Sequence, residues 1–226
     1  MDALVAMAEN GCDVLEVGVP YSDPVMDGLV IQQATEVALQ NGFRLNQLFD
    51  VISGVRKRVQ TPMLVMSYWN PVIRYGVEEF ATALKQSGAQ GMITPDLIPD
   101  EASQWLEVSD RLELDRVFLV APSSSDDRVL NNSELSRGFV YSVSTMGITG
   151  ERARLDELAR SVVSRVKHAS ATPTCVGVGI STAEQVREVN SYADGAIVGT
   201  AFVKSYQTGG LSALEAKTKE LAVGLG

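Results

Sequence analysis

The sequence predicts an α/β fold with a parallel sheet, and three observations lead to this prediction. Apolar segments rich in β-branched residues recur at intervals of roughly 20 to 40 residues. Amphipathic segments with helical spacing lie between them. The chain has 226 residues, of which 45% are hydrophobic and 21% are charged, as in globular proteins rather than disordered or fibrous ones. An open doubly wound sheet and a (β/α)8 barrel both fit this alternation.

Seven of the apolar segments are expected to be strands, one fewer than a complete (β/α)8 barrel has. In chain order they are 14–19, 63–66, 91–94, 117–120, 139–143, 174–180 and 195–203. The helices expected among them are 45–59, 77–85, 101–108, 155–166, 183–189 and 211–221. The segment before Gly11 has a helical pattern and leads directly into the first strand, so a further strand is expected upstream. We therefore interpret residues 1–226 as a single domain truncated at its N-terminus.

Charge and hydropathy exclude several classes of protein. The net charge of −9 disfavours nucleic acid and anionic membranes as partners, because both bind positive surfaces. No run of residues is long and apolar enough for a membrane helix, and the N-terminus has no signal-peptide pattern. Cys12 and Cys175 lie in apolar segments without CxxC spacing, which is typical of small buried residues in a reducing compartment. These features predict a cytoplasmic protein.

Glu16 is a carboxylate in an otherwise apolar strand. The two-residue period of a strand places it on the face opposite Leu15 and Val19. If those side chains pack under the helices, Glu16 points into the barrel, where desolvation raises the pKa of a carboxyl group. Glu16 is therefore a candidate general acid/base, and a structural ion pair is the alternative. Asp27 lies on the loop after this strand as a candidate second carboxylate, and capping the helix that begins near Leu29 is its alternative role.

Glycine-rich segments, GVGIST and VGTAF, follow the last two expected strands. The corresponding loops of (β/α)8 barrels commonly bind phosphate. Backbone N–H groups of Gly179, Gly199 and Thr200 are expected to hold the anion, and tight turns are the alternative reading. The segment STMGITG at 144–150 offers further hinges and amide donors.

Two kinds of chemistry are not expected, because the sequence lacks the residues that they need. No lysine lies at the mouth of an expected strand except Lys204, so an imine-forming nucleophile is not expected. His168 is the single histidine and lies at the end of an expected helix. A metal site built from several histidines is therefore not expected.

The segment LEVGVPYSDPVMDG at 15–28 resembles the signature of the tryptophan synthase alpha chain family. The resemblance spans nearly the whole chain, through SYWNP at 67–71, TPDLIPDEA at 94–102, APSSSDDR at 121–128, VYSVSTMGITG at 140–150, GVGIST at 177–182 and GAIVGTAFVK at 195–204. It implies a (β/α)8 TIM barrel that here lacks the first strand and most of the first helix. It also implies retro-aldol cleavage of indole-3-glycerol phosphate to indole and glyceraldehyde 3-phosphate, with no cofactor in this chain. The implied partner is a beta subunit that carries pyridoxal phosphate, in an α2β2 assembly.

The resemblance assigns roles to the residues that match the family's motifs. Glu16 matches the catalytic glutamate, Asp27 the aspartate that engages the indole N–H, and Tyr141 the tyrosine near the reacting atoms. The family's phosphate contacts fall on Gly150, Gly179, Gly199 and Thr200. Tyr68, Asn70 and Asp96 match positions of the loops that support Asp27 and signal to the partner subunit.

The sequence departs from the family pattern at Met26, where a small residue is usual, and at Leu29, where proline is usual. The family's first strand has no counterpart, so the strands at 13–20 and 195–203 are expected to have unpaired edges. We expect this 226-residue form to be less stable than a complete barrel and to have weak or no activity alone. Thermal unfolding and turnover beside an N-terminally extended form test this, and equal values for both would contradict it.

Two other functions stay open. Another phosphate-binding barrel enzyme, such as an isomerase or epimerase of a phosphorylated sugar, explains the glycines but not Asp27. A truncated barrel that acts mainly as a non-catalytic partner subunit explains the missing strand but not the intact pair of Glu16 and Asp27.

Overall fold

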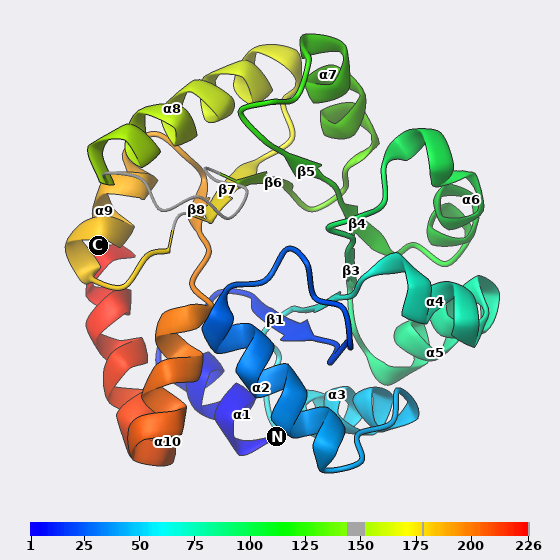
Figure 1. The fold of residues 1–226 in the computed structure, drawn as a ribbon, viewed down its shortest axis with the longest axis vertical. Coiled ribbons are helices and arrows are strands. Elements are labelled where there is room, and N and C mark those ends of the chain that lie inside the picture. The colour runs from blue at the N-terminus through cyan, green and yellow to red at the C-terminus, as the bar shows by residue number, and fades with distance from the viewer. Residues whose placement is uncertain (144–151, 178, 226) are drawn as a thin grey trace.

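The computed structural model describes residues 1–143, 152–177 and 179–225. In these residues short strands form an inner ring, and helices surround it (Figure 1). The strands are β1 (Leu15–Gly18), β2 (Met63–Met66), β3 (Gly91–Ile93), β4 (Asp115–Val117), β5 (Leu119–Val120), β6 (Val140–Val143), β7 (Thr174–Gly177) and β8 (Gly195–Ala196). The helices are α1 (Asp2–Glu9), α2 (Leu29–Gln40), α3 (Asn46–Arg56), α4 (Trp69–Tyr75), α5 (Val77–Ser87), α6 (Ser103–Arg111), α7 (Asp126–Leu135), α8 (Arg152–Ala169), α9 (Ala183–Asn190) and α10 (Thr200–Ala222).

The described strands pair in parallel, in the orders β1-β2-β3-β4 and β5-β6-β7-β8. Only Phe118 separates β4 from β5, so the two are parts of one strand and the ring has seven positions within the described ranges. The predicted alternation and the count of seven strands are confirmed. Across the described residues β1 pairs only with β2, and β8 only with β7. The expected unpaired edges are confirmed as well.

The largest apolar core lies between the first strands of the ring and the helices outside them. Trp105 and Phe80 are fully buried there, and burying a large apolar side chain contributes about 1.5–3 kcal/mol. Leu15 and Val19 belong to the same core, with 2% and 8% of their surface exposed. The apolar face of β1 therefore packs under the helices, and the opposite face, with Glu16, is left for the interior of the ring.

The prediction of a strand over 195–203 is wrong beyond Ala196, where β8 ends. The N–H groups of Phe202 and Val203 donate to the carbonyl oxygen of Gly199 at 3.0 and 3.1 Å, which begins α10. Apolar β-branched residues suit a buried strand and a buried helix alike, so the pattern alone does not place this boundary.

A break at Gly210 divides α10 into two parts. Gly210 has φ 65° and ψ −153°, a conformation that is essentially restricted to glycine. After the break, Leu214 and Leu221 are buried in the core. Before the break the helix starts at Thr200, just after β8, beside the ring of strands (Figure 1).

Candidate active site

Glu16 lies inside the ring, on the face of β1 that the helices do not cover. Burial among the surrounding protein atoms raises the pKa of its carboxyl group to about 7, and the negative charge of Asp27 raises it further. The side chain nevertheless keeps accessible surface. Both facts hold if the carboxyl group lies in a hollow that water can enter but that protein atoms enclose. A carboxyl group with a pKa near 7 can both donate and accept a proton at neutral pH.

Asp27 is held by a tyrosine from the next strand–helix loop. The hydroxyl group of Tyr68 accepts a hydrogen bond from the backbone N–H of Met26 at 2.8 Å, and it also bonds to the carboxylate of Asp27. A tyrosine hydroxyl has one proton to donate, so that proton goes to Asp27. Burial raises the pKa of Asp27, while the bond from Tyr68 lowers it. Burial also raises the pKa of Tyr68 to about 12, so that it stays a neutral donor.

Tyr141 approaches the same two carboxylates from β6. Its ring lies against Gly177 of β7, because a Cβ atom added at Gly177 would stand 2.7 Å from the tyrosine oxygen. Burial raises the pKa of Tyr141, and the charges of Glu16 and Asp27 raise it further. The structure therefore brings together the three residues predicted to be catalytic, with a neutral hydroxyl near two carboxyl groups.

The predicted phosphate contacts lie at two glycine turns. Gly179 follows β7 with φ +69°, and Gly199 precedes the first turn of α10; an added Cβ would meet nothing within 4 Å at either glycine. Thr200 is the first residue of α10. The predicted contact Gly150 and the segment 144–150 lie outside the described residues.

The starts of α9 and α10 differ in their free N–H groups. Thr182 and Gln185 form a capping box at α9, so its first N–H groups already have side-chain partners. Gly199 caps α10 without a side-chain acceptor, which leaves N–H groups of its first turn available to an anion. The start of α10 is therefore the better anion site.

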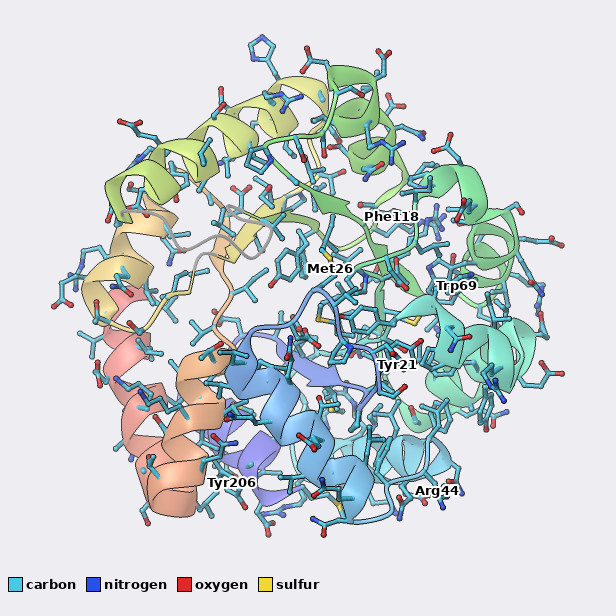
Figure 2. The ribbon with its side chains drawn as sticks, in the orientation of Figure 1. Tyr21, Met26, Arg44, Trp69, Phe118 and Tyr206 are labelled. Carbon is cyan, nitrogen blue, oxygen red and sulfur yellow. The ribbon has the colours of Figure 1, made fainter. Side chains whose placement is uncertain are left out.

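The three predicted loop-supporting residues connect the loops after β1, β2 and β3. Asp96 accepts the backbone N–H of Trp69 at 2.9 Å, where α4 begins. Asn70 donates to the hydroxyl group of Tyr21 at 3.1 Å, and the ring of Tyr21 lies 5.2 Å from that of Tyr68. Figure 2 shows Tyr21 and Trp69 on neighbouring segments. Sequence reasoning missed Tyr21, although an aromatic residue directly after a strand in a polar loop was a usable signal.

The structure also shows where the single histidine and the two cysteines lie. His168 lies in the last turn of α8, as expected. Cys12 and Cys175 are free thiols that are half-buried rather than fully buried. Within 1–143, 152–177 and 179–225, no group of three or more His, Cys, Asp or Glu residues could hold a metal ion. Over the same residues, no helix has the length and hydrophobicity to cross a bilayer.

Comparison with known proteins gives consistent matches over nearly the whole chain. Residues 1–224 match the family model described as Tryptophan synthase alpha chain. The tryptophan synthase alpha chain of Leifsonia xyli subsp. xyli is 56% identical over 224 residues, which cover 99% of this chain and 86% of that protein. The one of Mycobacterium avium is 51% identical over 225 residues, covering 100% and 83%. The aminoacrylate-bound tryptophan synthase from M. tuberculosis aligns with a TM-score of 0.92 at 46% identity, covering 99% of this chain and 86% of that one.

Proposed function

Because the chain belongs to the tryptophan synthase alpha chain family, we propose that Glu16 and Asp27 carry out the family's reaction in it. The chain is a carbon–carbon lyase with a TIM-barrel fold, and it cleaves indole-3-glycerol phosphate in tryptophan biosynthesis. The observation that carries the proposal is the Glu16 carboxyl group, with a pKa near 7, beside the charge of Asp27 inside the barrel.

Glu16 serves as the proton shuttle. In its protonated form it donates a proton to the ring carbon that bears the glycerol phosphate chain. The resulting carboxylate then takes the proton from the neighbouring hydroxyl group. The electron pair of the carbon–carbon bond returns to the ring, which leaves as indole, and the hydroxyl carbon becomes the aldehyde of glyceraldehyde 3-phosphate. The ring gains one proton and the hydroxyl group loses one, so a single carboxyl group serves both steps, and such transfer contributes roughly 10²- to 10⁴-fold.

Asp27 accepts the indole N–H and stabilises the positive charge that develops on the ring when its carbon is protonated. This electrostatic effect is strongest where water is excluded. The neutral hydroxyl group of Tyr141, close to both carboxyl groups, orients the reacting hydroxyl of the substrate. The bond from Tyr68 favours the ionised form of Asp27, which is the form that accepts a hydrogen bond.

The substrate phosphate binds to backbone N–H groups of Gly179, Gly199 and Thr200, together with Gly150. The free first turn of α10 supports this assignment, because helix N-termini bind anions through N–H groups and the helix dipole. It also suits a chain with a net charge of −9, since no lysine or arginine is needed.

The remaining features of the proposal concern the setting of the enzyme. The partner is the tryptophan synthase beta subunit in an α2β2 assembly, and the similarity of this chain to the M. tuberculosis tryptophan synthase structures supports this partner. Pyridoxal phosphate resides in the beta chain of this family, and we propose that this chain binds no cofactor of its own. Residues 1–226 act as one domain, in the cytoplasm.

Indole release from indole-3-glycerol phosphate tests the two carboxyl groups. We expect Glu16→Gln to lower kcat at least about 100-fold and Asp27→Asn to lower it at least about tenfold, while the exposed control Glu107→Gln matches wild type. Stimulation of a beta subunit by the inactive variants would show that they still fold and dock. Wild-type activity in both variants would overturn the proposal.

A further inference from the structure

We propose that Tyr21 is a positioning residue for the catalytic loop, fixing Asp27 through the ring of Tyr68. The inference rests on the role proposed above for Asp27 and adds a residue to that site. Tyr21 directly precedes the loop that carries Asp27, and it contacts the neighbouring loop through both its ring and its hydroxyl group.

Two contacts fix the side chain of Tyr21. Its ring lies 5.2 Å from the ring of Tyr68 at an interplanar angle of 32°, within the range of favourable aromatic pairs. Its hydroxyl group accepts a hydrogen bond from the Asn70 side chain at 3.1 Å. Asn70 lies in the first turn of α4, and Asp96 holds the start of that helix through the N–H of Trp69. Tyr21 is thus tied to a fixed point of the barrel.

Tyr68 transmits this position to the catalytic loop. Its side chain is only 6% exposed, and its hydroxyl group bonds to the backbone of Met26 and the carboxylate of Asp27. The other bonds of the loop are local and hold its backbone: the Asp27 N–H donates to the carbonyl oxygen of Pro24 at 3.1 Å, and the Gln32 side chain donates to the carbonyl oxygen of Asp27 at 2.8 Å. Neither holds the carboxylate of Asp27, and Val25 at the tip is 80% exposed. A shift of the Tyr68 ring therefore moves the carboxylate of Asp27, and Tyr21 is the aromatic neighbour that resists such a shift.

The hydroxyl group of Tyr21 can be removed without leaving a buried polar group unpaired. Tyr21 and Asn70 both line an open cavity of about 460 Å³, and the Asn70 side chain is exposed. In Tyr21→Phe the amide of Asn70 turns to water, so the cost to folding is small. Any loss of activity then reports on the position of the ring rather than on unfolding.

The test compares Tyr21→Phe with wild type and with Tyr206→Phe, a matched control on a half-exposed tyrosine of α10 that lies away from Tyr21 and Met26 (Figure 2). We expect kcat to fall about threefold to tenfold with KM little changed, the usual effect of one hydrogen bond. Hydrogen exchange of the Met26 amide should be faster, because its acceptor Tyr68 is less well held. Tyr206→Phe should match wild type in all three.

The pH profile supplies a readout that a purely structural role would not move. The bond from Tyr68 lowers the pKa of Asp27, so a looser Tyr68 raises that pKa. The acid limb of the kcat profile should therefore shift to higher pH in Tyr21→Phe. Glu16 and Tyr141, the other titratable groups that face Asp27, keep their contacts in this variant.

A second variant separates the contact from its consequences. Asn70→Ala should reproduce the effects of Tyr21→Phe, and the double variant should lose no more than either one alone. Unchanged kcat, pH profile and Met26 exchange in Tyr21→Phe would overturn the inference, and so would a lower thermal stability with these three unchanged. A failure of the role proposed for Asp27 would appear differently, as full activity of Asp27→Asn. The two failures can be told apart because the exchange rate of the Met26 amide reports on the loop and does not depend on catalysis.

Discussion

Replacing Glu16 with glutamine should make the protein more stable at pH 8 while it abolishes cleavage. The pKa of this carboxyl group rises from 4.5 to about 7 in the folded protein. At about 1.4 kcal/mol for each pH unit, ionised Glu16 costs the fold at most about 3.5 kcal/mol. Because the side chain keeps accessible surface, screening by water reduces this limit to about 1 kcal/mol.

The sign of the pH dependence follows from the raised pKa. The folded protein binds this proton more tightly than the unfolded chain, so the cost is absent below about pH 4.5 and is complete only above about pH 7. The gain from glutamine should therefore be largest at pH 8 and shrink several-fold at pH 5.

Thermal unfolding at both pH values, beside turnover, measures this effect. For a chain of this size about 1 kcal/mol corresponds to a rise in Tm of roughly 2–4 °C. The exposed control Glu107→Gln should show no such rise. A lower Tm for Glu16→Gln at pH 8, or an equal gain at both pH values, would refute the reasoning that burial of the charge sets the pKa of Glu16.

Three further substitutions test other parts of the structure. Gly91→Ala should lower stability by about 1–3 kcal/mol in urea unfolding, because its Cβ would overlap the backbone of Asp115 on the next strand; an unchanged midpoint would contradict the close strand contact. Thr182→Ala should cost about 1 kcal/mol by removing the capping box with Gln185, and Thr182→Ser should restore most of it. Gly179→Ala strains a residue at φ +69° by about 1–2 kcal/mol and should raise KM for indole-3-glycerol phosphate severalfold more than it lowers kcat, whereas an unchanged KM would argue against a phosphate contact there.

The position of Glu16 could be predicted because it depends on local periodicity. Alternation along four residues of β1 decides which face is apolar, and Leu15 and Val19 are buried under the helices as that alternation predicts. The value of its pKa could not be predicted in the same way, because it depends on how closely Asp27 and the rest of the ring approach.

The sequence could not predict the end of the last strand or the contacts of Tyr21, and the reasons differ. Residues 195–203 are apolar except for Thr200, and such a run suits a buried strand and a buried helix equally. Tyr21 and Tyr68 are 47 positions apart, and their ring contact arises only once two loops meet above neighbouring parallel strands. Motif resemblance placed Tyr68 and Asn70 in loops that support Asp27, but it did not indicate that Asn70 bonds to Tyr21.

Because of the break at Gly210, the two parts of α10 have different axes. The part of α10 after it is anchored by Leu214 and Leu221, and the part before it takes another direction beside the barrel, with Phe202 packed against the core. A side chain at position 210 would favour one continuous helix. The ten residues of α10 before the break would then point in another direction, and the N–H groups at the start of the helix would be displaced most. The orientation of the proposed anion-binding end therefore depends on Gly210, so a substitution there would change the affinity for a phosphorylated ligand without disturbing the hydrophobic anchor formed by Leu214 and Leu221.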